Sequence, residues 1–477
     1  MLTFDYIKST RKLRIKSDDQ KLYDRLREHF SVENEGARFA RRRYRFVASR
    51  KYVITNAGAC DIGLYWEIRQ YLIKNQIQTD IHITDNLKSV LNNGIADTIH
   101  TEFKFKLREY QEEVIGKALR LGMGTCVLGT GAGKTFTTAA LIENFFRRAS
   151  DKDTFKCLML VPDLGLVQQT YDEFINCGTT YKITKWTGKT KPDLTANVII
   201  ANIGIIQSRF EENDWLKYVD LLIVDECHKI TSGNKISKIV QKIQTLNKFG
   251  FTGTLPENQL DKWSIIGKLG PVIYEKTSAE LRLEDYLANV TVKVLKLNYK
   301  QSLVYTTQDR YREELDFIYE SYDRNNFITK LADKLPNNTL ILVNHIKHGE
   351  SLMNHLTSLG DRQVYFIRGE VDVEEREKIK KIMENNSNVI CVAISAIFST
   401  GVNIKNLHNI VFAAGGKSFI RTVQSIGRGL RKHKTKNKLV IIDLCDNLQY
   451  GRRHCDKRKD IYNKEKIAFK ETSVDLF

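Results

Sequence analysis

The stretch "CVLGTGAGKTFTTAAL", residues 126–141, places a glycine-rich loop between a strand-like apolar run and a helix-like one. A loop at a helix N-terminus directs backbone N–H groups and the positive end of the helix dipole at an anion. Gly131 and Gly133 have no Cβ, so the backbone can come close to phosphate oxygens. In such a loop Lys134 reaches the β- and γ-phosphates and the Thr135 hydroxyl ligates Mg²⁺. The stretch therefore predicts a nucleotide-phosphate site.

One position departs from the strict phosphate-loop pattern, G-x-x-x-x-G-K-[ST], because the chain has Leu128 where that pattern has glycine. A flexible glycine turn without a ligand is the alternative interpretation, but the strand–loop–helix context favours a phosphate loop. The residues that we expect to contact the nucleotide here are Gly129, Thr130, Gly131, Ala132, Gly133, Lys134 and Thr135.

A second candidate element is "LLIVDECHK", residues 221–229, an apolar strand that ends in two adjacent carboxylates. Asp225 can hold a hydrated Mg²⁺ at the tip of the strand, and Glu226 can orient and deprotonate an attacking water. A solvated turn is the alternative when such a pair stands alone. His228 is either a surface histidine or a link to the "TGT" loop at 252–254, and we favour the link.

Short apolar strands alternate with helical patterns from about residue 103 onward, which is typical of a parallel α/β sheet. The first group of expected strands is 126–128, 157–161, 198–201, 221–224 and 249–252. The second group is 340–343, 364–367, 389–393, 410–412 and 439–442. The segment 308–335 reads as helical. We predict a small unit over residues 1–100 that mixes strands and helices, followed by α/β domains over 101–290 and 291–477.

The chain is strongly basic, since 75 lysines and arginines outnumber 57 aspartates and glutamates and give a net charge of +18. Such an excess indicates a polyanionic partner, and solubility alone is the alternative. The apolar runs are shorter than the ~20 residues that span a bilayer, and the N-terminus has no apolar signal-like core. We therefore expect a cytoplasmic protein without a membrane partner. Its eight scattered cysteines suggest reduced, mostly buried thiols.

Basic residues are concentrated in "RFARRRYRFVASRK", residues 38–51. As a strand, this stretch would place alternate side chains on opposite faces. A structural edge strand explains Tyr44 and Phe46, for which we prefer core packing, but not the density of arginines. The residues that we expect to contact duplex phosphates are Arg41, Arg42, Arg43 and Arg45. Phosphate contacts set affinity and register without reading sequence.

Five motifs occur in the order found in superfamily-two helicases: "LREYQ" (107–111), "GTGAGKT", "DECH" (225–228), "TGT" and "QSIGRGLR" (424–431). "LVPDLGLVQQ" (160–169) and "SAIFSTGVNIKN" (395–406) also resemble motifs of that family. The resemblance covers about residues 103–445. It implies two tandem RecA-like parallel-sheet domains, here preceded by the small basic α+β domain. In that family Leu128 is an acceptable residue.

The resemblance also implies roles for individual residues. Arg108 and Gln111 resemble the adenine-recognition pair, although both could simply cap a helix. Gln424, Arg428 and Arg431 share one helical face and resemble the arginine-finger helix that acts at the γ-phosphate. Two groups of residues complete the set that the family motifs imply: Gly401 and Asn403 for sensing nucleotide and nucleic acid, and Gln168 and Gln169 for touching the nucleic-acid backbone.

A narrower resemblance extends over nearly the whole chain. "LYDRLREHFSVENEGARFARRRYRF" (22–46) and "FIRGEVDVEER" (366–376) resemble the UvsW-type phage recombination helicases. That group implies an ATP- and Mg²⁺-dependent DNA helicase that remodels forks, Holliday junctions and displacement loops, acting in the host cytoplasm if phage-encoded. The alternatives are a duplex-DNA translocase subunit of a restriction-type system, an RNA helicase, and a nucleic-acid-binding protein with an inactive ATPase.

Overall fold

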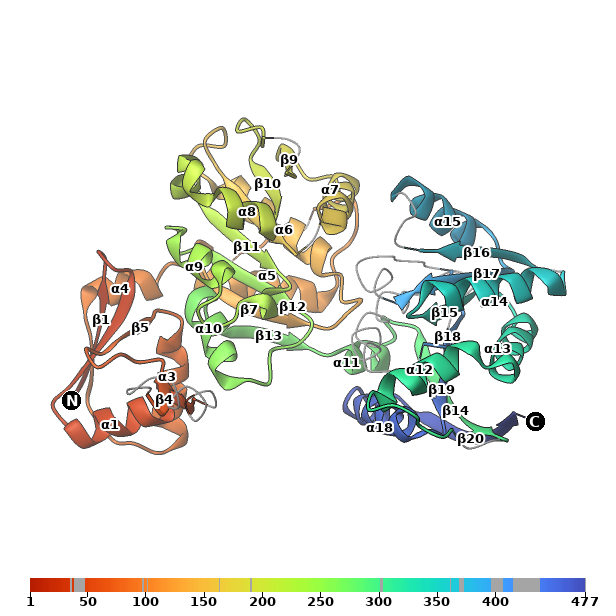
Figure 1. Cartoon of the computed structure of the whole chain (residues 1–477). Coiled ribbons are helices and arrows are strands. Elements are labelled where there is room, and N and C mark those ends of the chain that lie inside the picture. Colours follow the sequence, from red (N-terminus) through yellow and green to blue (C-terminus); the bar gives the residue numbers. More distant parts are fainter. Residues whose placement is uncertain are drawn as a thin grey trace. The chain divides into compact units, whose positions relative to one another are not determined.

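A computed structural model describes most of the chain. Its described residues are 1–34, 37, 48–96, 98–100, 102–162, 164–188, 191–300, 303–360, 362–368, 373–395, 406–414 and 438–476. Contacts divide the chain into two compact units. Residues 1–128 and 133–275 form the first unit, and residues 129–132 and 276–477 form the second. Figure 1 labels the helices and strands.

The N-terminal part of the first unit contains a four-stranded sheet in the order β5-β2-β1-β6. Strands β1 and β2 form an antiparallel hairpin, β5 is antiparallel to β2, and β6 is parallel to β1. The strands are β1 (Leu2–Ile7), β2 (Lys12–Ser17), β5 (Ala59–Asp61) and β6 (Ile81–Ile83), and the short pair is β3 (Ser31–Glu33) with β4 (Arg50–Tyr52). The helices are α1 (Gln20–His29), α3 (Leu64–Lys74) and α4 (Asp85–Leu91).

The core of this N-terminal part includes a residue from far along the chain. Alternation in β1 buries Leu2, Phe4 and Tyr6 on one face of the sheet. Trp263 joins the same core, with its ring centroid 5.2 Å from that of Phe30. Trp263 belongs to helix α10 (Gln259–Leu269), which packs against α3 and β5. The N-terminal sheet is therefore built against α10.

The rest of the first unit is a seven-stranded sheet in the order β13-β7-β12-β11-β8-β10-β9, and each register recorded in it is parallel. The strands are β7 (Gly124–Leu128), β8 (Cys157–Val161), β9 (Ile183–Trp186), β10 (Val198–Asn202), β11 (Leu221–Asp225), β12 (Lys248–Thr252) and β13 (Val272–Lys276). Consecutive helices of this unit pack against each other. One such series is α5 (Glu109–Leu121), α6 (Lys134–Arg148) and α7 (Leu164–Cys177), and the other is α8 (Ile203–Arg209), α9 (Lys235–Lys242) and α10.

The second unit contains another seven-stranded sheet, in the order β16-β17-β15-β18-β19-β14-β20, whose registers are parallel. The strands are β14 (Asn289–Tyr299), β15 (Thr339–Val343), β16 (Gln363–Ile367), β17 (Val389–Ile394), β18 (Asn409–Phe412), β19 (Lys438–Asp446) and β20 (Phe469–Leu476). The helices are α11 (Ser278–Leu283), α12 (Arg310–Glu320), α13 (Tyr322–Lys334), α14 (Ile346–Leu359), α15 (Val373–Asn385) and α18 (Gln449–Lys464).

These two parallel sheets confirm the predicted α/β class with tandem RecA-like sheets after a small α+β part. All ten expected strands are present, within a few residues of their predicted bounds. The predicted helical segment 308–335 is interrupted at Ser321, which ends α12 and caps α13. All eight cysteines are buried and free. Across the described ranges, no helix is long and apolar enough to cross a membrane.

Candidate ATP site

The glycine loop links the end of β7 to the start of α6. Gly131 and Gly133 have φ values of 85° and 73°, a region that side chains with a Cβ rarely adopt. A Cβ at Gly133 would lie only 2.8 Å from the Gln111 side-chain nitrogen. Lys134 is the first residue of the 15-residue helix α6. The loop therefore has the conformation and the helix N-terminus that a phosphate cradle requires.

The Lys134 ammonium group is held near the acidic end of β11. Its Nζ donates to the Leu128 carbonyl at 3.3 Å and lies 3.9 Å from Glu226 Oε1. Both side chains are largely buried, at 15% and 22% exposed. Because the carboxylate is only loosely paired with the ammonium, a phosphate oxygen can take its place as the partner of Lys134. The predicted lysine and carboxylate are thus brought together in one unit.

The two adjacent carboxylates lie at a left-handed turn at the end of β11. Glu226 has φ 48° and ψ 47°, which is the left-handed region for a residue that has a Cβ. Its N–H donates to the Asp225 side chain at 2.9 Å. Left-handed backbone at a non-glycine residue costs of order 1 kcal/mol and is common at functional sites. The turn separates one carboxylate that can serve a metal ion from one that can serve a water.

His228 joins this turn to the "TGT" loop, as the sequence predicted. Its Nδ1 lies 2.9 Å from Thr252 Oγ1 and 3.2 Å from Glu226 Oε2. The Thr252 hydroxyl donates to the Thr254 carbonyl at 2.9 Å, so it must accept from His228. His228 therefore donates from Nδ1, and this N–H is shared between the threonine and the carboxylate. A chain of polar contacts runs from Lys134 through Glu226 to the "TGT" loop.

Arg108 and Gln111 lie at the start of α5. The backbone N–H of Arg108 donates to the Gln111 side-chain oxygen at 3.0 Å, while the Arg108 guanidinium donates to the Tyr110 hydroxyl at 2.9 Å. Gln111 is 2% exposed and lies against Gly133. The hydrogen bond between the Arg108 N–H and Gln111 caps the N-terminus of α5. Helix capping is the structural alternative that the sequence left open for these two residues. The position beside the glycine loop is compatible with the adenine role, which stays a prediction.

Cys227 is the part of the "DECH" segment that serves packing. It is fully buried in the core of the sheet, and burial raises the pKa of its thiol well above the usual value. A Cβ at Gly250 of β12 would lie 2.8 Å from the Cys227 sulfur. The lone glycine in "KFGFT" is the sequence signal for this close approach. The pair sets the spacing of the acidic turn from β12.

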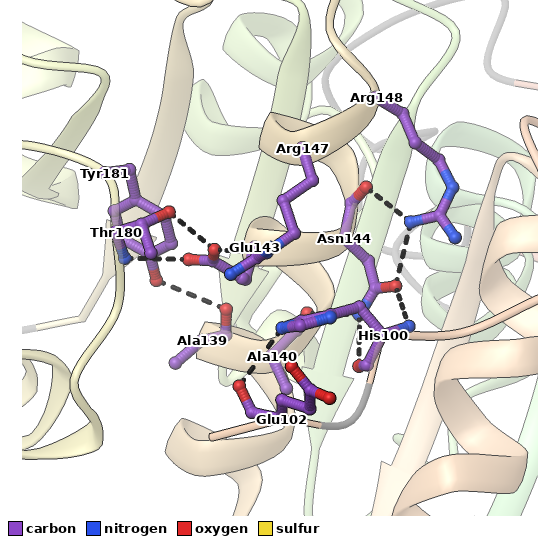
Figure 2. A network of polar contacts seen from close by, with 10 residues as sticks. All are labelled: His100, Glu102, Ala139, Ala140, Glu143, Asn144, Arg147, Arg148, Thr180 and Tyr181. Carbon is purple, nitrogen blue, oxygen red and sulfur yellow. Dashed lines mark hydrogen bonds and ion pairs between the residues drawn. The ribbon is translucent and has the colours of Figure 1, made fainter. Parts of the chain in front are cut away.

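Helix α6 is fixed on both sides by buried polar side chains (Figure 2). The Asn144 side-chain amide accepts from the His100 N–H at 2.7 Å and donates to the His100 carbonyl at 3.1 Å. It therefore pairs with the backbone of His100 as a neighbouring strand would. Glu143 accepts from the Thr180 N–H at 2.9 Å and from Arg147 at 2.8 Å. This network was not predicted, because isolated polar residues on a helix are usually solvated. It holds the helix that begins with Lys134.

The predicted nucleic-acid contacts on α7 have partners within the protein. Gln168 is exposed, donates to Asp172 at 2.8 Å and accepts from Lys185 at 2.6 Å. Gln169 is half-buried and donates to Glu173 at 3.0 Å. These contacts leave the predicted role untested. The other expected site residues lie outside the described residues: Gly401, Asn403, Gln424, Arg428 and Arg431, and the arginines Arg41, Arg42, Arg43 and Arg45.

Two protein families match this chain, one in the region of each seven-stranded sheet. The family described as "Type III restriction enzyme, res subunit" matches residues 104–257, and "Helicase conserved C-terminal domain" matches residues 323–433. The "ATP-dependent DNA helicase uvsW" of Enterobacteria phage T4 is 27% identical over 96% of this chain and 97% of its own length. The chain belongs to the superfamily-two helicases. It is therefore an enzyme of the class that couples ATP hydrolysis to helicase activity.

One further relative and one solved structure are also similar to this chain. The "DNA 3'-5' translocase XPB2" of Sulfurisphaera tokodaii is 26% identical over 79% of this chain and 88% of its own length. A solved fragment of a putative HsdR subunit of a type I restriction enzyme from Vibrio vulnificus has a TM-score of 0.58 at 19% identity. The match covers 90% of this chain and 85% of that fragment, and the two proteins share their fold.

Proposed function

We propose that this superfamily-two helicase is an ATP- and Mg²⁺-dependent DNA helicase or translocase that remodels branched DNA. The observation that carries the proposal is the contact chain Lys134–Glu226–His228–Thr252, which joins the phosphate loop to the "TGT" loop. The full-length similarity to the phage T4 uvsW protein supports the choice of DNA. We propose domain limits of 1–100, 101–290 and 291–477 for the DNA-binding part and the two motor domains.

Each residue of the site would serve one step of hydrolysis. The N-terminus of α6 and Lys134 bind the phosphates, and Thr135 with Asp225 would hold Mg²⁺, which supplies Lewis-acid stabilisation when bound. Glu226 orients the attacking water and accepts its proton. His228 senses this event, because the same ring proton contacts Glu226 and Thr252. Loss of the γ-phosphate would thereby change the position of the "TGT" loop.

The remaining predicted residues would complete the motor. Arg428 and Arg431, on the face shared with Gln424, would stabilise charge on the transferred phosphoryl group. Gly401 and Asn403 would respond to both ligands. The alternating grip on DNA would come from α7, through Gln168 and Gln169, and from the arginines of residues 41–45.

Glu226→Gln tests the hydrolytic role most directly. The amide keeps the shape of the side chain but cannot accept the proton, so kcat should fall by about 10²–10⁴-fold while ATP binding is kept. Glu211→Gln is the matched control, since that carboxylate is exposed and pairs only with exposed Lys242 among the recorded ion pairs. Steady-state ATP turnover and nucleotide binding measure both effects. Retained turnover in Glu226→Gln would show that another group activates the water.

The DNA assignment is tested by ATP turnover with equal nucleotide concentrations of four-way junction, linear duplex, single-stranded DNA and RNA. We expect the junction to stimulate most, with strand exchange visible on a gel. Equal stimulation by plain duplex would favour a translocase of the restriction type, and stimulation by RNA alone would contradict the DNA assignment. Neutralising three of the arginines in 41–45 should flatten the slope of log K against log salt by about 0.9 per lost phosphate contact.

A further inference from the structure

A small cavity lies where the N-terminal sheet meets α9 and α10, all within the first unit. It encloses about 40 Å³, on a scale on which one water needs roughly 10–15 Å³. The cavity is therefore large enough for one group of several heavy atoms and too small for a nucleotide. Arg11 reaches it from the β1–β2 turn, Lys248 from β12 and Lys268 from α10. The other charged and hydroxyl groups of the lining belong to Tyr6, Asp61 and Thr245.

The charge around this cavity is unbalanced. Asp61 is the carboxylate of the lining, and it pairs with Lys12 and, at 2.7 Å, with Lys268. Although burial alone would raise the pKa of Asp61, its two lysine partners outweigh that effect and hold the pKa below the usual value. One carboxylate therefore faces two paired lysines, and the charge of Arg11 is in excess, joined by that of Lys248 when this side chain is protonated. Both side chains are half-buried, and partly buried charge of one sign is costly unless a counter-ion is present.

Lys248 is the most constrained of these cations. Its Nζ donates to the Val240 carbonyl at 2.6 Å and the Ile243 carbonyl at 2.7 Å, at the C-terminal end of α9. Burial and then the charge of Arg11 lower the pKa of Lys248 to about 7, with Lys268 and Lys12 acting in the same direction and Asp61 opposing them. Tyr6 is the other titratable group in the lining, and burial raises its pKa.

A purely structural role explains only part of this arrangement. Both Lys248 and Arg11 cap α9, since Arg11 donates one guanidinium N–H to the Lys242 carbonyl at 3.2 Å. Carbonyl groups carry partial charges only, and one bond uses one of the five N–H groups of arginine. Arg11 also holds a left-handed backbone, with φ 54°, in a turn closed by its own N–H to the Ile7 carbonyl at 2.7 Å. Such a conformation persists where surrounding contacts fix it.

We propose that Arg11 and Lys248 form a binding site for one tetrahedral oxyanion of the phosphate type at this junction. The shared chemistry is a tetrahedral anionic group with several acceptor oxygens, supplied either by a DNA backbone phosphate or by a free phosphate. The anion bridges the β1–β2 turn of the N-terminal sheet to α9. Helix α9 follows the "DECH" segment after the loop at residues 230–234, so the bound anion ties the N-terminal part to the element next to the acidic turn.

Sulfate is the first probe, because its charge stays constant near neutral pH. In thermal unfolding of the full chain, we expect a saturable stabilisation that follows ligand binding to the folded state. Binding restores the proton on Lys248, so affinity should weaken on going from pH 7.5 to 8.5, by at most about tenfold for one proton. Arg11→Gln and Lys248→Met should each weaken the affinity at least fivefold, and Lys248→Met should remove the pH dependence.

Matched controls are Arg14→Gln on β2 and Lys238→Met on α9, which change exposed cations of the same elements. Equal sulfate responses in the wild-type protein and in both cavity variants would overturn the proposal, because sulfate also stabilises folded proteins by exclusion. Either variant alone decides the question if the other fails to fold. Sulfate that weakens binding of a short duplex in the wild type but not in Lys248→Met identifies a DNA phosphate; unaffected duplex binding identifies a free oxyanion. The sulfate arm needs no helicase activity, so it stands apart from the proposed function.

Discussion

Replacing Arg324 by methionine should destabilise the second unit strongly. The guanidinium donates to Asp446 from Nε at 2.7 Å and from Nη2 at 3.1 Å, and to the Ala413 carbonyl at 3.0 Å. Tyr299 also donates to Asp446, at 2.6 Å. The two charged side chains are 0% and 1% exposed. Burial alone would lower the pKa of Arg324, but the Asp446 carboxylate outweighs it and the pKa is raised.

The size of the effect follows from the charge left behind. Methionine fills similar space but leaves Asp446 buried with a hydroxyl and no cation, which costs about 3–5 kcal/mol. For a unit of about 200 residues, each kcal/mol lowers Tm by roughly 2–4 °C, so the loss should be about 6–20 °C.

Calorimetric unfolding of the full chain measures this loss. Arg312→Met, at an exposed position of α12, is the matched control and should shift Tm little. Adding Asp446→Asn to Arg324→Met should recover much of the loss, because the amide carries no charge. A double variant as unstable as the single one, or an Arg324→Met shift no larger than the control, would refute the reasoning.

Three further results are expected. Lys134→Ala should lose both ATP affinity and turnover, as measured by nucleotide binding and steady-state kinetics, whereas loss of turnover alone would contradict the phosphate-binding role. Gly133→Ala combines φ 73° with a contact 2.8 Å from Gln111, so ATP affinity should fall about 5–30-fold for 1–2 kcal/mol; Gly233→Ala, with φ 81° and open space, is its control. Arg428→Ala should lower kcat more than it raises KM, and a defect mainly in KM would identify a binding group.

Central strands were predictable because burial on both faces gives short apolar runs. β8, "CLMLV", and β11, "LLIVD", are buried along nearly their whole length and match their predicted positions. The edge strands β9 and β13 were not predicted, since their residues are mostly half-buried and read as mixed polar sequence. The break at Ser321 was missed for another reason: the apolar periodicity continues across it, and only the hydroxyl cap of α13 marks the new helix.

The candidate site was predictable where chemistry requires particular residues next to each other in sequence. The glycine loop and the "DECH" segment are of this kind, and the structure brings Lys134 and Glu226 together. Contacts between distant segments were not predictable, because their partners carry no local signal. Asn144 with His100 is one case, and Asp61 between Lys12 and Lys268 is another. The first contact depends on how the segment between α4 and α5 packs against α6, and the second depends on how the N-terminal sheet packs against α10. The spacing of residues in the sequence indicates neither of these packing arrangements.

The placement of Trp263 has a consequence for how this protein can be divided or recombined. This indole fills the N-terminal core and is 4% exposed, yet it belongs to a helix encoded more than 150 positions later. A fragment that stops near residue 100 loses the indole and should fold poorly by itself, since deletion of a buried aromatic typically costs 3–5 kcal/mol. The remaining motor would expose the same ring to solvent and tend to aggregate. Exchange of N-terminal parts between relatives should therefore succeed only when residue 263 is exchanged with them.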